Sequence, residues 1–339
     1  MTKSDLKNWL ITGGAGFIGA NLLSALLQRG TVRQIRIVDD LSTGSIATVK
    51  HLTPLRVLDS GSAEPMGKDA GVELVQVSVT DGDAAKRLTE GADVVVHLAA
   101  NTGVQPSIRN PIADATTNVF GILNYLEAAR EAGVKSFIFS SSGAPTGRAQ
   151  PPIHEEIPCK PMSPYGASKL AGEGYCFAYD AAYGLNTVAL RFSNVYGKYS
   201  GRKGSVVAHF LRRAVAGQSW ILNGGGTQTR DFICVDDLVD AIMLAAKLGK
   251  GGELFQIATA RETSIAELAS IMSAVLREEH GIEIKLEQGP ALQGDMPRNF
   301  ADNSKARAML GWSPRVSLES GIRTTAEWFL ADQGQPLRN

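Results

Sequence analysis

Short apolar runs alternate with helical patterns through the first 192 residues of the chain. The apolar runs predict buried strands at residues 8–12, 34–38, 73–77, 94–98, 136–140 and 186–191. Apolar positions at helical spacing predict helices between them, at residues 16–29, 83–90, 112–132 and 165–183. Because strands alternate with helices, we expect an α/β fold with a Rossmann-type, doubly wound parallel sheet and helices on both faces.

The pattern changes after Arg191. Irregular, glycine-rich sequence continues to Gly226 and predicts no regular element. Two helices are expected after it, at residues 235–248 and 264–279, followed by a polar tail. Residues 41–72 carry several glycines and prolines and have no assignment.

The length of the chain, 339 residues, exceeds the size at which a single core usually divides, so we expect two lobes. Residues 1–192 would form the sheet domain, with a segment near 229–258 returning to it. Residues 193–228 and 259–339 would form a smaller C-terminal α/β lobe over the carboxyl edge of the sheet. Because ligands of open parallel sheets bind at that edge, the smaller lobe is expected to hold the substrate.

Charge and composition mainly exclude classes of partner and site. Lys plus Arg and Asp plus Glu both number 34, so no overall charge favours a nucleic acid or a membrane surface as a partner. No apolar run reaches the length of a membrane-spanning helix. The cysteines and histidines lack the spacing of metal ligands, so no metal site is expected. The resulting expectation is a cytoplasmic protein.

A glycine motif follows the first expected strand and begins the first expected helix. Gly13, Gly16 and Gly19 are three residues apart, which allows a tight turn and a close approach of the backbone to a pyrophosphate. Asp39 lies 20 residues beyond Gly19, at the end of the second expected strand. Its carboxylate can accept hydrogen bonds from an adenosine ribose and repel a 2′-phosphate. The motif therefore predicts a dinucleotide site that prefers NAD to NADP.

A tyrosine and a lysine lie four residues apart at the start of the helix expected at 165–183. Tyr165 and Lys169 share one face of that helix, and Ser163 and Pro164 before them are typical of a helix start. A neighbouring ammonium favours the phenolate, so Tyr165 is a candidate base near neutral pH. Residues 140–142 place three serines at the end of a strand, where one could relay a proton or all three could simply begin a loop.

These motifs and others give the chain a resemblance to a known family. The segments that carry it are TGGAGFIG at 12–19, DDLSTG at 39–44, HLAA at 97–100, NVFG at 118–121, SSS at 140–142, SPYGASKLAGE at 163–173, RFSNVYG at 191–197, TRDFICVDD at 229–237 and SKARAMLGW at 304–312. The chain resembles an extended short-chain dehydrogenase/reductase of the NAD-dependent nucleotide-sugar epimerase/dehydratase family. Its pattern is most similar to that of the UDP-glucose 4-epimerases.

The resemblance implies a set of site residues. The implied catalytic residues are Ser142, Tyr165 and Lys169. The implied NAD contacts are Gly13, Gly16, Phe17, Ile18, Gly19, Asp39, Asp40, Ser42, Thr43, Gly44, Ser78, Val79, Leu98, Ala99, Ala100, Asn118, Ser140, Tyr165 and Lys169. The implied substrate contacts are Ser142, Tyr165, Asn194, Arg230, Arg298 and Asn299. Helices near 112–132 and 165–183 resemble the pair that forms the family's dimer, so we expect a homodimer.

The implied reaction is epimerisation at C4 of a UDP-hexose through a transient 4-keto sugar, with Tyr165 as base and tightly bound NAD as hydride carrier. Gly143 and Ala144 stand where sugar 4,6-dehydratases carry an Asp–Glu pair and UDP-xylose-forming decarboxylases carry the Glu, which argues against both. A nucleotide-sugar dehydrogenase or reductase stays open, as do a dinucleotide sensor and an epimerase of UDP-N-acetylhexosamine or UDP-glucuronate. The sensor is disfavoured because all three catalytic residues are present.

Other positions depart from the family pattern. Thr146 replaces the usual tyrosine of the sugar pocket, and Ser78 replaces an aspartate that contacts adenine. Leu292 occupies the place of a second arginine for the diphosphate, and Arg298 is the alternative on the other side of the late Gly-Asp. The residue at Asn299 has a middle size and leaves plain and N-acetylated hexoses open.

Overall fold

The central sheet of the computed structural model has eight parallel strands within the described residues, which are 6–291 and 296–332. Their order across the sheet is β12-β7-β6-β5-β1-β2-β4-β3. The bounds are β1 (Asn8–Thr12), β2 (Gln34–Asp39), β3 (Leu55–Leu58), β4 (Gly71–Gln76), β5 (Val94–His97), β6 (Ser136–Ser142), β7 (Thr187–Phe192) and β12 (Glu253–Ile257). From β1 the sheet continues through β5, β6, β7 and β12 on one side and through β2, β4 and β3 on the other, so the doubly wound prediction is confirmed.

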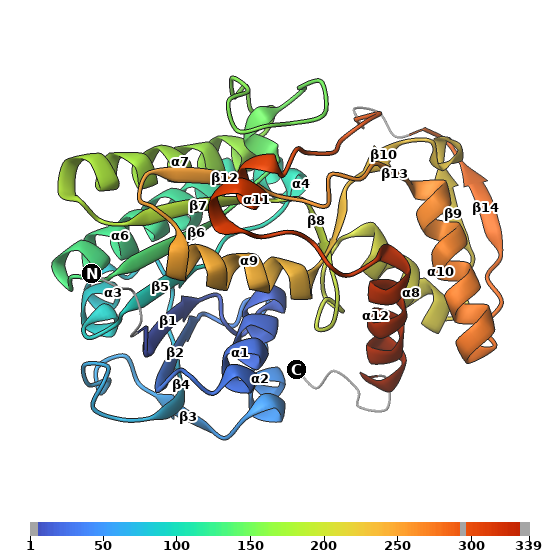
Figure 1. The fold of residues 1–339 in the computed structure, drawn as a ribbon. Coiled ribbons are helices and arrows are strands. Elements are labelled where there is room, and N and C mark those ends of the chain that lie inside the picture. The colour runs from blue at the N-terminus through green and yellow to red at the C-terminus, as the bar shows by residue number, and fades with distance from the viewer. Residues whose placement is uncertain (1–5, 292–295, 333–339) are drawn as a thin grey trace.

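Helices cover both faces of this sheet because its strands are apolar on both sides. Trp9 and Ile11 of β1 lie in one buried cluster, while Leu10 lies in the other, as the alternation of side chains along a strand requires. The first cluster packs under α1 (Phe17–Arg29), α2 (Ile46–Leu52) and α9 (Val235–Leu248). The second packs under α3 (Gly82–Thr89), α6 (Gly121–Glu131) and α7 (Pro164–Tyr183). Figure 1 shows the sheet between these two layers.

The two clusters on the faces of the sheet form the first core of the molecule. A second hydrophobic core is formed by elements that lie to the right of the sheet in Figure 1. Its side chains come from β8 (Asn194–Tyr196), α8 (Val206–Val215), β9 (Trp220–Asn223), β11 (Phe232–Cys234), α10 (Ile265–His280) and α12 (Leu318–Asp332). Beside these elements, β14 (Leu286–Gly289) pairs with β9, and β10 (Thr229–Arg230) pairs with β13 (Thr263–Ser264). Between them, α9 and β12 return to the large sheet, where β12 pairs with β7. We keep the division into lobes at residues 192, 229 and 258 as a proposal.

Two expectations for the second half of the chain were wrong. The stretch expected to be irregular contains α8, whose buried residues Val207, Phe210, Leu211 and Ala214 recur at helical spacing, and β9 with the fully buried Trp220. The expected polar tail contains α11 (Ser304–Leu310) and α12, which packs Ile322 and Phe329 into the second core. Only one side of each helix is apolar, so charged residues lie between the apolar positions. These charged residues and the flanking glycines made the helical spacing hard to recognise in the sequence.

The helix expected at 112–132 is divided into three pieces. After α4 (Val104–Arg109), the chain forms α5 (Pro111–Ala115), a π-helical turn at Thr116–Phe120, and then α6. A π-helical turn inserts an extra residue into the helix and re-aims the side chains on it, and such turns are frequent at functional sites. This turn carries Asn118.

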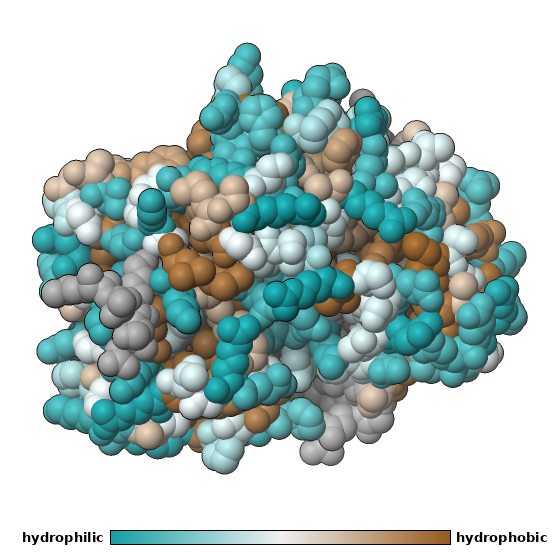
Figure 2. All heavy atoms as spheres, in the orientation of Figure 1, coloured by the Kyte–Doolittle hydropathy of each residue, from teal (hydrophilic) through white to brown (hydrophobic). Residues whose placement is uncertain are grey.

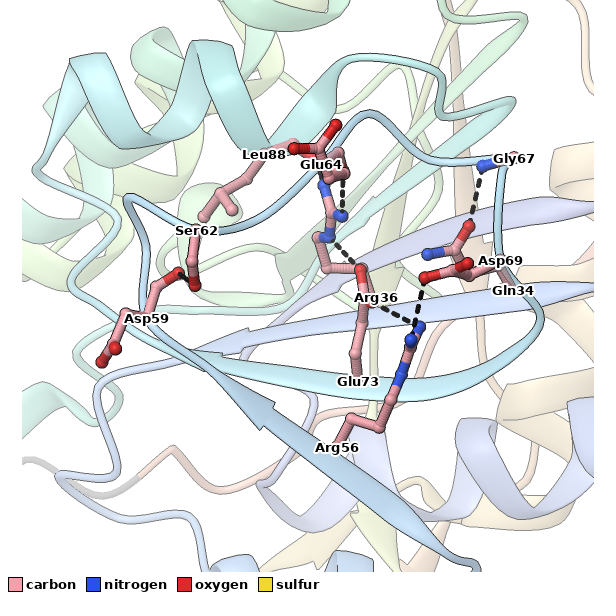
Figure 3. A network of polar contacts seen from close by, with 10 residues as sticks. All are labelled: Gln34, Arg36, Arg56, Asp59, Ser62, Glu64, Gly67, Asp69, Glu73 and Leu88. Atoms are coloured by element: carbon pink, nitrogen blue, oxygen red, sulfur yellow. Dashed lines mark hydrogen bonds and ion pairs between the residues drawn. The ribbon is translucent and has the colours of Figure 1, made fainter.

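Residues 41–72, left unassigned, contain α2 and β3, and a network of polar contacts lies beside β3 in addition to the apolar packing of α2. Arg36 on β2 donates to the carboxylate of Glu73 on β4 at 2.5 Å, and both side chains are fully buried (Figure 3). The same guanidinium donates to the carbonyl oxygens of Leu88 and Glu64, at 2.7 and 2.6 Å. Arg56 on β3 then joins Glu73 to Asp69. Because α2 and β3 are short and Val49 is their one fully buried residue, hydrophobic periodicity does not reveal these elements.

On the face shown in Figure 2, hydrophobic residues occur in small patches separated by hydrophilic ones, apart from the grey residues. That face therefore offers no broad apolar surface. Among residues 6–291 and 296–332, no helix combines the length and the apolar character needed to cross a membrane.

Candidate active site

The loop between β1 and α1 has the shape that a pyrophosphate requires. Gly13 has a φ of +67°, and a Cβ there would lie 2.8 Å from the backbone nitrogen of Ala99. A Cβ on Gly19 would lie 2.4 Å from the Cα of Gly14, so only glycine lets α1 pack this closely. No side chain caps α1 at Gly16, which leaves the N–H groups of its first turn for an anion. These residues fit the diphosphate of NAD.

The position of this loop follows from the strand order. β1 lies between β2 and β5, and the chain winds away from it in opposite directions. Ligands of such sheets bind in the crevice at this switch point, outside the carboxyl ends of the strands. Leu98 and Ala99, which follow β5, bond from their N–H groups to the carbonyl and the side chain of Thr12. The glycine loop and the segment 98–100 therefore meet at the crevice, as the resemblance implied.

Asp39 does more than the sequence indicated. Its carboxylate accepts hydrogen bonds from the N–H groups of Ala15 at 3.0 Å and Leu41 at 2.8 Å, so it holds the glycine loop from the end of β2. Burial raises the pKa of Asp39, while these two backbone bonds oppose the rise. A Cβ on Gly44 would come within 3.0 Å of the carboxylate, which explains the glycine there. The remaining lone pairs of Asp39 suit a ribose hydroxyl.

The other expected adenosine contacts surround Asp39. Asp40 accepts hydrogen bonds from the N–H and the hydroxyl of Ser42, which orders the turn through Thr43. Val77 donates its N–H to the carbonyl of Asp39, so Ser78 and Val79 follow directly beside the end of β2. Phe17 and Ile18 form the first turn of α1. The expected adenosine-side residues therefore gather around one crevice, and their contacts with NAD stay a proposal.

Tyr165 and Lys169 lie in the first two turns of α7, where Ser163 caps the helix by accepting from the N–H of Gly166 at 3.1 Å. The ammonium of Lys169 donates to the carbonyl oxygen of Ser140 at 2.7 Å and lies 5.9 Å from the centroid of the Tyr165 ring. Burial lowers the pKa of Lys169 to about 8. This pairing agrees with the expected one, with the ammonium held against the end of β6.

The expectation that Lys169 lowers the pKa of the phenol does not hold in the protein alone. Burial raises the pKa of Tyr165 to about 12, a hydrogen bond with Ser142 opposes the rise, and the charge of Asp114 adds to it. Desolvation disfavours the phenolate more strongly than the available hydrogen bond favours it. The phenol is therefore protonated at neutral pH in the protein alone.

The three serines that end β6 have three different roles. Ser140 donates its hydroxyl to the carbonyl of His97, Ser141 donates to Glu173, and Ser142 contacts Tyr165. The alternative left open, that all three simply begin a loop, is therefore wrong. His97 itself is buried among aromatic rings, and burial lowers its pKa to about 3, so it is a neutral packing residue.

A buried ion pair behind α7 was not identified from the sequence. Arg191 on β7 donates to both carboxylate oxygens of Glu173, from Nε at 2.8 Å and Nη2 at 2.6 Å. Glu173 also accepts from Ser141 at 2.5 Å, so the pair holds α7 against β6 and β7. The spacing of Glu173, four residues after Lys169, is the one signal that could have indicated it.

Asp114 is a second charged residue that sequence reasoning missed. Its side chain is 2% exposed, and its Oδ1 accepts from the amide of Asn118 at 3.0 Å. Asn118 in turn accepts from the N–H of Asn101 at 2.7 Å, which places the expected asparagine at the segment after β5. The charge of Asp114 adds to the rise that burial causes in the pKa of Tyr165 and opposes the fall that burial causes in the pKa of Lys169. It therefore contributes negative charge at the catalytic pair.

Apart from Ser142 and Tyr165, the expected substrate residues lie beyond β7, on β8, on β10 and after residue 296. Asn194 is exposed and begins β8, while Arg230 on β10 donates to the carbonyl of Met296 at 2.8 Å. Arg298 forms a two-point pair with Glu262, both bonds at 2.7 Å, so its guanidinium is already paired in the protein alone. Asn299 follows it. Leu292 lies outside the described residues.

The junction below these residues depends on a buried carboxylate that sequence reasoning also missed. Asp231 is fully buried and accepts from the N–H groups of Thr259 and Ala260 and from the Thr259 hydroxyl. It thereby fixes the segment after β12 beside Arg230. Burial raises the pKa of Asp231, and these hydrogen bonds oppose the rise.

The loop after Ser142 carries no acid or base. Gly143 and Ala144 enter a short 3₁₀ turn, in which the hydroxyl of Thr146 donates to the carbonyl of Gly143 at 2.7 Å. Thr146 is buried, so it does not take the place of the missing tyrosine hydroxyl in a pocket. In the described part of the chain, no group of three or more His, Cys, Asp or Glu residues is arranged to hold a metal ion.

Comparisons with known proteins agree with this geometry. Residues 9–258 match the model of the NAD dependent epimerase/dehydratase family. The UDP-glucose 4-epimerase of Mycolicibacterium smegmatis is 38% identical over 94% of this chain and 97% of its own length. The structure of UDP-glucose 4-epimerase with UDP-glucose from Thermotoga maritima is 34% identical, with a TM-score of 0.83, and covers 96% of this chain and 99% of that one.

A structure of UDP-N-acetylglucosamine 4-epimerase from Methanobrevibacter ruminantium, in complex with UDP-N-acetylmuramic acid, has the same TM-score of 0.83 at 28% identity. It covers 96% of this chain and 99% of that one. Similar relatives thus differ in the sugars that their names give. The glycine loop, the Ser142, Tyr165 and Lys169 arrangement and the family match together identify the chain as an NAD-dependent enzyme that belongs to the NAD dependent epimerase/dehydratase family.

Proposed function

We propose that this enzyme epimerises C4 of a UDP-hexose of the UDP-glucose and UDP-galactose type through a transient 4-keto sugar. The observation that carries the proposal is the combination of an intact Ser142, Tyr165 and Lys169 set with a following loop of Gly143 and Ala144. Removal of water or carboxylate from a 4-keto sugar needs an acid and a base of its own. This loop has neither, which favours a second hydride transfer that reduces the keto sugar again.

The side chains divide the proton chemistry between them. Tyr165 takes the proton of the C4 hydroxyl and later returns it to the same oxygen, while Ser142 hydrogen-bonds the phenol and the sugar oxygen. Bound NAD supplies a reversible hydride acceptor and a positive charge that favours the phenolate. Lys169, whose ammonium donates to the carbonyl oxygen of Ser140, adds a positive charge near the phenol. The sugar must turn between the two transfers, which requires a pocket that grips the diphosphate more firmly than the hexose.

We propose that residues of the second lobe bind the diphosphate of the substrate. Arg230 and Asn194 lie at the junction with the sheet, and Asp231 fixes the backbone there. Guanidinium groups bind diphosphates by paired, charge-assisted hydrogen bonds. Arg298 would contribute only after release from Glu262, so we assign the main contact to Arg230.

Incubation with a set of UDP-sugars tests the proposal and distinguishes the possible substrates. Purified protein would be incubated without added cofactor with UDP-glucose, UDP-galactose, UDP-glucuronate and both UDP-N-acetylhexosamines, and the products would be separated by chromatography. The proposal expects interconversion of UDP-glucose and UDP-galactose with no accumulation of NADH. Conversion of only the N-acetylated pair or only the glucuronate would move the assignment to that sugar. Stoichiometric NADH formation on added NAD would overturn epimerisation in favour of a dehydrogenase.

A further inference from the structure

One lysine of the second lobe lies against the cofactor loop of the first. Lys203 belongs to the segment 198–205, which is part of the connection from β8 to α8. Its ammonium lies 5.0 Å from the centroid of the Phe17 ring. Phe17 is the first residue of α1 and follows Gly16 directly, so the cation is placed at the helix start where a dinucleotide diphosphate binds.

The segment is held in this position by bonds on both of its sides. Asn21 of α1 donates from one amide nitrogen to the carbonyls of Phe17 at 2.8 Å and Lys198 at 2.9 Å. From the other side, Arg212 of α8 donates to the carbonyls of Gly201 and Lys203, at 2.7 and 2.8 Å. These bonds hold the backbone of the segment on both sides and thereby fix the position of Lys203.

The charge of Lys203 is not balanced by a carboxylate. Its ammonium donates to the carbonyl of Val195 at 2.8 Å, and no Asp or Glu of the described residues forms an ion pair with it. The side chain is half-buried, and burial lowers its pKa to about 8. A cation in such a place is disfavoured unless an anion joins it. At neutral pH the amine of Lys203 still carries its proton, so it can bind an anion.

We propose that Lys203 is an NAD contact: its ammonium binds the diphosphate at the start of α1, and segment 198–205 closes over the cofactor from the second lobe. The helix start donates N–H groups to the diphosphate, and Lys203 adds the full positive charge that the glycine loop lacks. The contact joins the two lobes through the cofactor. It therefore slows the release of NAD, as an epimerase that regenerates its cofactor in each turnover requires.

The test measures cofactor binding and does not depend on which sugar is the substrate. Full-length wild type, Lys203→Met and Arg202→Met would be compared by equilibrium dialysis with NAD, ADP-ribose, adenosine and UDP. Arg202 is the exposed neighbour and serves as the control for loss of one positive charge. We expect Lys203→Met to weaken NAD and ADP-ribose binding at least about tenfold, since hydrogen bonds to charged groups are this strong. Adenosine, which has no phosphate, should bind wild type and Lys203→Met with equal affinity.

Several outcomes would overturn the proposal. Equal NAD affinity of Lys203→Met and wild type would show that the lysine does not contact the cofactor. A loss of UDP affinity with unchanged NAD affinity would assign Lys203 to the substrate diphosphate instead. Equal weakening by Arg202→Met would reduce the effect to general charge. A Lys203→Arg variant keeps the charge, and we expect it to retain more NAD affinity than Lys203→Met, which a purely structural loss would not give.

Discussion

Tyr165 and Lys169 illustrate how burial sets the chemistry of a single residue. The phenol and the ammonium lie on one helix face, yet burial raises the pKa of Tyr165 to about 12 and lowers that of Lys169 to about 8. Both shifts favour the neutral form of the group. The motif could be predicted from the sequence, whereas the direction of the tyrosine shift could not, because it depends on the residues packed around the phenol.

A Tyr165→Phe variant tests the base directly. Removal of the hydroxyl leaves no acceptor for the C4 proton, so we expect turnover to fall by about 10²–10⁴-fold. NAD binding should change little, because the ring remains. Loss of turnover with NAD still bound would exclude the sensor alternative. A variant that epimerises at the wild-type rate would remove Tyr165 from the mechanism.

Stability against pH tests the burial of Lys169. Its pKa of about 8 in the folded protein lies below the ordinary value of 10.5, so the folded state binds fewer protons between these values. The protein therefore gains stability as pH rises from 8 to 10.5, by about 3 kcal/mol from this group. Lys169→Met should thus be more stable than wild type at pH 7.

Denaturant midpoints of the two proteins at pH 7 and pH 10 would measure this difference. We expect the advantage of Lys169→Met to shrink at the higher pH. Lys203, whose pKa is also about 8, titrates in both proteins and cancels in the comparison. A difference that stays constant with pH would contradict a buried, readily deprotonated Lys169.

At the scale of elements, periodic segments could be predicted and polar ones could not. The strands β1, β5 and β7 and the helices α7 and α9 follow apolar patterns and lie within two residues of their expected bounds. By contrast, β3 pairs with β4 beside the polar network of Arg36, Arg56 and Glu73, which no hydrophobic pattern records. The π-helical turn at Asn118 likewise follows from side-chain bonds to Asn101 and Asp114.

A Glu73→Gln variant tests the weight of that buried pair. It leaves the Arg36 guanidinium buried without a charged partner, so we expect a loss of about 3–5 kcal/mol in the free energy of unfolding. Asp69→Asn removes an exposed charge from the same network and should cost much less, because solvent screens an exposed pair. Urea unfolding of both variants would measure this. Equal effects would show that burial does not decide the strength of the network.

At the scale of the molecule, the chain passes between two cores and exposes several large apolar side chains. Apolar side chains are exposed around α4, α5, the π-helical turn and α7: Ile108, Ile112, Phe120 and Tyr183 are 52%, 75%, 60% and 58% exposed. Clusters of this kind mark protein interfaces. We propose that they form the contact of a homodimer, as the resemblance implied for these helices.

Light scattering tests the dimer. Wild type should have twice the chain mass of 36.0 kDa at micromolar concentration. Phe120→Glu should shift it towards the monomer, whereas Leu286→Glu, at an apolar residue 45% exposed on β14, should not. A wild-type mass of one chain, or equal effects of both variants, would contradict this interface.

The central claim is that the hydrogen removed from C4 returns to C4. The direct measurement uses UDP-galactose labelled with deuterium at C4, with the product examined by proton NMR and mass spectrometry. The account predicts UDP-glucose that retains the deuterium at C4 and incorporates none from deuterated water in the reverse experiment. Loss of the label to solvent during conversion would contradict the account, because it would mean that C4 is inverted by proton exchange and not by a hydride that leaves and comes back.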